Sequence, residues 1–152
     1  MNTNIVEPYL TFSGRCEEAL EFYRQAVGAE ILCIMRFNQS PEPPPPDMLA
    51  PGFENKIMHS LFKIGESTLM ASDGCDDKET FGGFSLSLRA ADEADAKERF
   101  NALAEGGEIT MPLDKTFWSP CFGMLKDKFG LSWMIGVFPE QAPAQDPTHP
   151  SA

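Results

Sequence analysis

The same order of predicted elements occurs twice in this chain, and that repeat constrains the fold more than any other feature. A short β-prone segment, a helix and three further strands run from residue 8 to 72, and the same order returns from residue 84 to 138. Matching positions share an offset of 77 residues: Pro8 with Ser85, Gly14 with Ala91 and Tyr23 with Phe100. The repeat predicts an α+β fold of two βαβββ modules.

Two segments carry the helical pattern. Residues 14–27 place apolar side chains at helical spacing on one face, and Gly28 is a typical stop after the last turn. The second helix is predicted from about Asp92, a good N-terminal cap, to Glu105, with Gly106 and Gly107 ending it. The apolar faces are Cys16, Ala19, Leu20, Tyr23 and Val27 in the first helix, and Ala96, Phe100 and Leu103 in the second.

The strands are predicted from β-prone, partly alternating runs. In residues 56–64, Met58, Phe62 and Ile64 alternate with Ile57, His59 and Leu61, so His59 is predicted to point away from the helices if Phe62 points toward them. The predicted strands are residues 8–12, 31–37, 56–64 and 68–72 in the first module, and 84–88, 109–118, 122–126 and 131–138 in the second.

Proline marks the irregular segments. Six of the 13 prolines lie between Pro41 and Pro51, and a ring that fixes φ and lacks an N–H cannot sit inside a helix or a strand. Residues 40–52 are therefore predicted to form a long loop, which explains why the offset falls to 65 between Gly65 and Gly130. One domain is predicted over residues 1–138, with modules of about 5–80 and 81–138. Residues 139–152 are predicted to form a flexible Pro-rich tail.

The net charge limits the classes of molecule that the protein is expected to bind. Twelve basic and 23 acidic side chains give a net charge of −11, which disfavours nucleic acids and anionic membranes because both bind basic surfaces. A neutral or cationic small molecule is compatible with this charge. No apolar run approaches the length of a membrane helix, and the polar start lacks a signal-peptide core, so the expected compartment is the cytosol. The four cysteines lack a Cys-x-x-Cys pair, which favours free thiols over a structural zinc site.

The chain resembles the vicinal oxygen chelate superfamily of glyoxalases, bleomycin-resistance proteins and dioxygenases. Within it, the chain is similar to the PhnB-like branch, which is often labelled as a 3-demethylubiquinone-9 3-methyltransferase domain. The resemblance spans residues 8 to 138. It rests on residues 8–12, 18–23, 28–30, 59–64, 69–73, 117–118 and 122–135, including Glu18-Ala19-Leu20-Glu21-Phe22-Tyr23 and Phe122-Gly123-Met124-Leu125-Lys126-Asp127.

The resemblance implies curved sheets around a cavity, a homodimer and, in the enzymes, a divalent metal in that cavity. The family's ligand positions fall here on Pro8, on Leu69 or Met70, near Gly83 with Ser85 two residues on, and on Met134. None of these is a good ligand for a hard divalent metal. We therefore expect no cofactor and no metal residue, although a divalent metal held in another way stays open.

Six residues form the predicted ligand site: His59, Met70, Asp73, Ser85, Trp118 and Met134. His59 is the candidate catalytic residue, because a histidine changes charge near neutral pH, and the alternative is a structural histidine. Asp73 precedes Gly74, so a turn is its alternative role. The aromatic residues near Trp118 suit either a planar ligand or core packing.

Two functions remain open at this level. The first is a glyoxalase-like, PhnB-like small-molecule protein with a degenerate metal site and an enzymatic activity of unknown type. The alternative is a metal-free binding or sequestering protein similar to the bleomycin-resistance proteins. A methyltransferase is not supported, because Ser13-Gly14-Arg15 is not a Gly-rich turn and the element order is not that of a doubly wound sheet.

Overall fold

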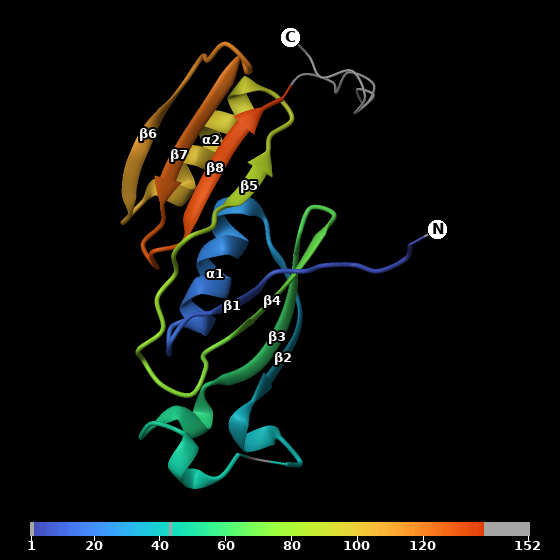
Figure 1. The fold of residues 1–152 in the computed structure, drawn as a ribbon, viewed down its shortest axis with the longest axis vertical. Coiled ribbons are helices and arrows are strands. Elements are labelled where there is room, and N and C mark those ends of the chain that lie inside the picture. Colours follow the sequence, from blue (N-terminus) through green and yellow to red (C-terminus); the bar gives the residue numbers. More distant parts are fainter. Residues whose placement is uncertain (1, 43, 139–152) are drawn as a thin grey trace, which may run out of the picture.

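The computed structural model describes residues 2–42 and 44–138, and these form two βαβββ modules (Figure 1). The predicted tail, residues 139–152, lies outside the described residues. The first module contains β1 (Tyr9–Thr11), α1 (Cys16–Val27), β2 (Glu30–Arg36), β3 (Ile57–Ile64) and β4 (Ser67–Ser72). The second contains β5 (Leu86–Arg89), α2 (Glu93–Ala104), β6 (Glu108–Asp114), β7 (Cys121–Lys126) and β8 (Ser132–Val137). The predicted α+β repeat is confirmed, and both helices match at an offset of 77 residues at each end.

Each module builds one mixed four-stranded sheet. The strand orders are β1-β4-β3-β2 and β5-β8-β7-β6, with β1 parallel to β4 and β5 parallel to β8. All other neighbours pair antiparallel. The two sheets do not close into a barrel, so each keeps one face against the helices and one face open. In Figure 1, β7 and β8 lie in front of α2, and the viewer looks at the open face of the second sheet.

Local hydrogen bonds mark the start of α2 and the end of α1. The Asp92 side chain accepts a hydrogen bond from the backbone N–H of Asp95 at the start of α2. Gly28 adopts a left-handed conformation, φ 68°, and its N–H donates to the carbonyl of Tyr23 at the end of α1. The predicted apolar faces are both buried: Cys16, Ala19, Leu20, Tyr23 and Val27 in α1, and Ala96, Phe100 and Leu103 in α2.

One hydrophobic core runs through both modules, because α1 packs against α2. The ring of Phe12 meets that of Phe129 at 5.8 Å between centroids, and the rings of Tyr23 and Trp133 lie 5.7 Å apart. Asp127 lies in this contact, 3 % exposed, and its carboxylate accepts hydrogen bonds from the Tyr23 hydroxyl at 2.5 Å and from Trp133 Nε1 at 2.9 Å. The modules are thus joined by aromatic packing around a fully hydrogen-bonded carboxylate.

Two predicted strands differ from the structure by more than one residue at one end. The strand predicted over residues 109–118 ends at Asp114, because Thr116 Oγ1 accepts hydrogen bonds from the N–H groups of Trp118 and Ser119 and turns the chain. The strand predicted from Phe84 begins at Leu86.

The prediction that Ile57 shares the face of His59 and Leu61 on β3 is wrong. Ile57 is fully buried in the core and does not share an open face with His59. The pairing of β2 with β3 changes register between Met35 and Arg36, opposite Ile57, and the N–H of Ile57 donates to Asp73. A simple alternation count therefore fails at this end of β3.

The proline loop is held at its ends rather than along its length. Phe37 and Phe53, which flank it, are buried, and the N–H of Ala50 donates to the carbonyl of Cys75. A short 3₁₀ helix covers Pro46–Met48, and Pro41 and Pro45 are exposed.

Replacing residues 41–46 with a short Gly-Ser link is expected to lower Tm by less than about 10 °C, because surface loops tolerate change. Phe53→Ala, measured beside it by thermal unfolding, is expected to cost about 3 kcal/mol. A larger loss from the loop replacement than from Phe53→Ala would show that the prolines pack into the body.

Candidate functional site

The open face of the first sheet carries a polar pair among apolar and sulfur-containing side chains. Ser60 lies within 3.9 Å of Cys16 on α1, so its neighbour His59 points to the opposite, open face. There His59 Nδ1 lies 3.1 Å from the hydroxyl of Tyr9, and the two rings are 5.7 Å apart. With the Tyr9 hydroxyl as donor, Nδ1 is the acceptor, and the neutral ring carries its proton on Nε2.

Strand pairing surrounds this pair with adaptable side chains. Tyr9 is paired with Met70, and Met70 with Leu61, so the three side chains share the open face. Met35 is paired with His59 itself and is 37 % exposed. Partial burial raises the pKa of the Tyr9 hydroxyl above its usual value, so the phenol stays protonated at neutral pH.

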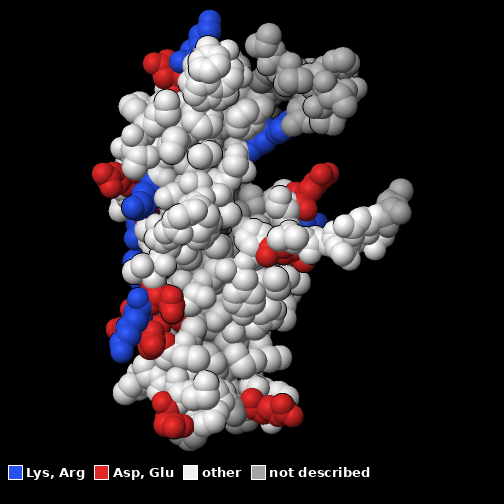
Figure 2. Space-filling view, in the orientation of Figure 1, with Lys and Arg blue, Asp and Glu red and all other residues white. Residues whose placement is uncertain are grey.

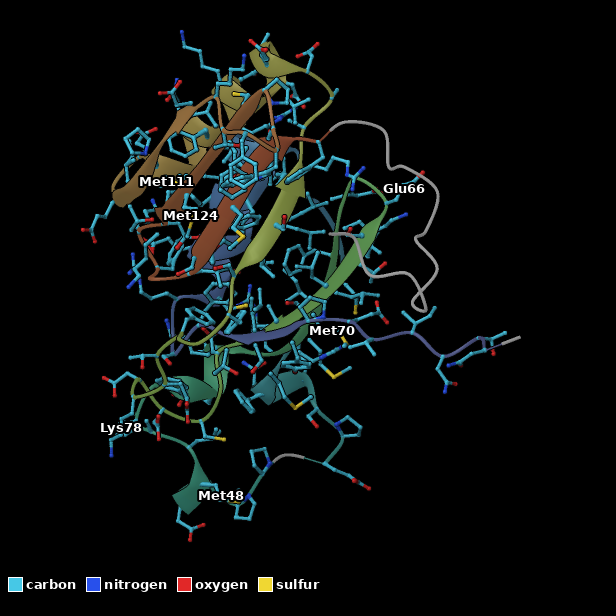
Figure 3. The ribbon with its side chains drawn as sticks, turned by 45° about the horizontal axis from the view of Figure 1, so that its top comes forward. Met48, Glu66, Met70, Lys78, Met111 and Met124 are labelled. Carbon is cyan, nitrogen blue, oxygen red and sulfur yellow. The ribbon has the colours of Figure 1, made fainter. Side chains whose placement is uncertain are left out.

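The predicted site residues fall into two groups. His59 and Met70 lie on the open face of the first sheet. Met134 lies on β8, in the second sheet, where it is paired with Ser87 and Met124. Figure 3 shows Met70 apart from Met111 and Met124, which lie on the second sheet.

Trp118 and Ser85 flank the second sheet. Trp118 lies in the loop after β6, 43 % exposed, with its ring 4.7 Å from that of Phe117 and 5.6 Å from that of Phe122. Ser85 is half-buried and directly precedes β5. One chain therefore does not bring the six predicted residues into a single cavity.

Asp73 has a structural position. It is 1 % exposed, and its two carboxylate oxygens accept hydrogen bonds from the backbone N–H groups of Cys16 and Ile57, each at 2.7 Å. The carboxylate thus caps the start of α1, where a negative charge is favourable, and ties that helix to β3. Gly74 follows with φ 70°, which matches the turn that was the alternative role for Asp73.

The described residues also line two cavities. A groove of about 950 Å³ runs between the N-terminal segment, the β3–β4 turn, β5 and α2. Its charged residues are of both signs, and Arg99 there pairs with Asp95 and donates to the carbonyl of Ala26. A smaller cavity of about 390 Å³ at the start of α1 includes Asp73, Arg36 and Lys56 in its wall. The first groove includes none of the six predicted residues.

The family's usual divalent metal does not fit the residues present. The positions that the resemblance assigns to metal ligands fall on Pro8, on Leu69 or Met70, near Gly83 with Ser85 two residues on, and on Met134. A thioether or a proline ring is a poor donor to a hard cation. Within residues 2–42 and 44–138, no cluster of three or more His, Cys, Asp or Glu side chains is placed to hold a metal. No chemical step is therefore assigned to a hard metal here.

Tyr9 is the site residue that sequence reasoning missed. Its strand was predicted, and the alternation of Tyr9, Leu10 and Thr11 around the buried Leu10 was the available signal. The contact with His59 joins residues 50 positions apart and depends on how β1, β4 and β3 are ordered in the sheet.

Comparison with known proteins identifies the family. The model of the family described as 3-demethylubiquinone-9 3-methyltransferase matches residues 4–136. Protein YjdN from Escherichia coli K12 is 35 % identical over 144 residues, which cover 90 % of this chain and 97 % of that protein. In the described part of the chain, no helix has the length and apolar character needed to cross a bilayer.

Solved structures agree with this family. Protein PA1353 from Pseudomonas aeruginosa is 40 % identical, covers 90 % of this chain and 98 % of its own, and superposes with a TM-score of 0.78. The PhnB protein from Bacillus cereus is 30 % identical, with 88 % and 99 % covered and a TM-score of 0.74. A glyoxylase/bleomycin resistance protein/dioxygenase domain from Frankia, 12 % identical with a TM-score of 0.60 over 91 % of this chain and all of that one, shares the fold alone. The chain therefore belongs to the 3-demethylubiquinone-9 3-methyltransferase-like family of PhnB-like proteins and has their glyoxalase-like fold.

Proposed function

We propose that this protein binds a small organic molecule on the open face of its first sheet without a hard divalent metal. The observation that carries the proposal is the Tyr9–His59 hydrogen bond, a polar pair on a partly exposed face beside Leu61, Met35 and Met70. Such a face offers directional contacts at one point and deformable apolar contacts around it. The net charge of −11 favours a cationic ligand among those of suitable shape.

A second candidate function is proton-transfer catalysis at the same place. The specific support is again the hydrogen bond of Tyr9 with His59, which leaves His59 Nε2 as the ring nitrogen that faces a ligand. Methyl transfer, which the family's name describes, gains no support from this fold. Two mixed four-stranded sheets replace the doubly wound parallel sheet that usually holds a nucleotide-type methyl donor.

We infer that the protein works in the cytosol as a homodimer. Apolar side chains are exposed on the edge strands, with Leu32 46 % and Ile109 50 % exposed. Figure 2 shows a broad uncharged area across both modules, with charged side chains mostly toward its margins. A second copy laid over the open faces would enclose the site and cover edge strands. Sedimentation at micromolar concentration is expected to give about twice the chain mass of 16.8 kDa, and a species of one chain mass would contradict the inference.

The ligand-binding proposal is tested with two aromatic dyes of similar size, cationic thioflavin T and anionic anilinonaphthalene sulfonate. The cationic dye is expected to bind at least tenfold more tightly at pH 7.5. His59→Gln, which removes the ring beside Tyr9, is expected to weaken binding of the cationic dye severalfold and to stay folded. His149→Gln, at the other histidine of the chain, is expected to keep the affinity. An unchanged affinity in His59→Gln would overturn the role of His59.

The metal content gives an independent prediction. Protein purified without chelator is expected to carry well under one equivalent of divalent metal, because Pro8 and Met134 replace good ligands. Added Ni²⁺ or Mn²⁺ is expected to leave Tm unchanged, since a cation that does not bind the folded state cannot stabilise it. Metal analysis and thermal unfolding check this. One tightly held equivalent that raises Tm would contradict it.

A further inference from the structure

Three methionines form one row across the open face of the second sheet. Met134 on β8 is paired with Met124 on β7, and Met124 is paired with Met111 on β6. Residues directly opposite one another in antiparallel strands point to the same face, so the three thioether side chains are neighbours. All three are partly exposed, and Figure 3 shows Met111 and Met124 on this sheet.

The strand that carries Met111 is irregular on both sides of it. The β6–β7 register shifts between Ile109 and Met111 and again between Met111 and Asp114, yet Met111 keeps its place opposite Met124. Irregularities of this kind re-aim side chains and are frequent beside functional sites. Pro112 lies next to Met111 on this edge strand, where a missing N–H is tolerated.

The two rows of paired residues beside the methionine row contain no sulfur, so the methionine thioethers are the soft donors within these three rows. Lys126 is paired with Glu108 and Ser132 on one side of the methionine row. On the other side, Phe122 is paired with Asp114 and Gly136. Adjacent strands lie about 4.8 Å apart, and each methionine has three rotatable bonds, so three sulfur atoms in one row can converge above Met124.

We propose that Met111, Met124 and Met134 form a binding site for one soft monovalent cation of the Cu(I) type. Thioether sulfur selects such ions over Mg²⁺, Mn²⁺ or Zn²⁺, which prefer oxygen, nitrogen or thiolate ligands. The acidic chain, at −11, favours a cation electrostatically, and the site needs no deprotonation to bind it. This site lies on the other sheet from Tyr9 and His59, and it stands or falls separately from the proposed function.

The test uses Ag(I), a soft monovalent ion that needs no reducing conditions, and protein labelled with ¹³C in the methionine methyl groups. Cys33, Cys75 and Cys121 are first replaced with serine, because exposed or half-buried thiols would compete, while Cys16 is fully buried and stays. At one equivalent of Ag(I), the signals of Met111, Met124 and Met134 are expected to move together. The signals of Met48 and Met70 are expected to stay in place.

Matched substitutions locate the site. Met124→Leu keeps the volume but removes the central sulfur, and it is expected to weaken Ag(I) binding at least tenfold. Met70→Leu, the same change on the first sheet, is expected to leave affinity unchanged. Thermal unfolding confirms that both variants fold, and an anaerobic Cu(I) titration against a chelator repeats the comparison. Unmoved signals of the three methionines, or equal losses in the two variants, would overturn the proposal.

Discussion

Replacing Asp127 with alanine is expected to lower the free energy of unfolding by about 4 kcal/mol, because several buried donors lose one shared acceptor. The carboxylate accepts from the Tyr23 hydroxyl, from Trp133 Nε1, and from the backbone N–H groups of Phe129 at 2.9 Å and Leu131 at 3.1 Å. These groups come from both modules and meet at a site shielded from solvent, since Asp127 is 3 % exposed.

Chemical denaturation of three variants separates this effect from a general effect of lost charge. Asp114→Ala removes an exposed aspartate whose hydrogen bond is to the adjacent N–H of Lys115, and its cost is expected to stay within about 0.5 kcal/mol. Tyr23→Phe removes only the hydroxyl and is expected to cost about 2 kcal/mol, as for a hydrogen bond to a charged group. A loss at Asp127 no larger than that at Asp114 would contradict the assigned role.

The same contact predicts the direction of the alkaline response. Burial, followed by the negative charge of Asp127, raises the pKa of Tyr23 well above its usual value. The contribution to stability is therefore fully present below about pH 10, where an unfolded tyrosine titrates, and is lost as the pH rises further, by about 1.4 kcal/mol per pH unit. Cys16, with its pKa raised to about 12 mainly by burial, adds a loss of the same sign from about pH 9. Tyr23→Phe is expected to show the shallower slope above pH 10.

Gly107→Ala is expected to destabilise the protein by about 3 kcal/mol, since overpacking against backbone cannot be relieved by a rotamer change. A Cβ atom at this position would lie 2.2 Å from the carbonyl oxygen of Lys126 and 2.9 Å from the Cα of Asp127. The tight approach joins the end of the α2 connection to the end of β7. Either that segment or the turn that positions Asp127 has to move to admit a methyl group.

Gly82→Ala is the matched control for this prediction. Gly82 has no atom within 4 Å of its would-be Cβ and does not have a positive φ. Its replacement is expected to change the free energy of unfolding by no more than about 0.5 kcal/mol, or to raise it slightly by restricting the unfolded chain. Similar midpoints for the two variants in a denaturant titration would show that the contact at Gly107 relaxes freely.

The helices and most strands could be predicted because their signals are local. The apolar face of α1 and the cap at Asp92 lie within single segments, and the offset of 77 residues holds at both ends of the two helices. The end of β6 could not be predicted, because the side chain of Thr116 competes with the sheet for backbone N–H groups. The burial of Ile57 depends on a register shift in the β2–β3 pairing, where the partners of Met35 and Arg36 are two residues apart on β3, and a simple alternation count does not indicate this shift.

The candidate site was only partly predictable for the same reason. Alternation along β3 indicates the direction of His59, but its contact with Tyr9 requires the strand order of the first sheet. Of the three methionines in the row, sequence reasoning identified only Met134, and the place of Met111 opposite Met124 depends on a strand with two register shifts. Asp73 reads as a turn residue from its neighbour Gly74, while its bonds to Cys16 and Ile57 require tertiary structure.

The two modules share one hydrophobic core and therefore depend on each other for stability. A duplicated unit that kept its own core would survive separation, but here α1 packs against α2, and Tyr23 reaches Asp127 across the repeat. Fragments made by cutting the chain between residues 77 and 81, where it has no helix or strand, would each leave an apolar helix face bare. Neither half is then expected to hold a native state in isolation, and mixing the two halves is expected to restore it. The repeat therefore does not make either module an independently folding unit.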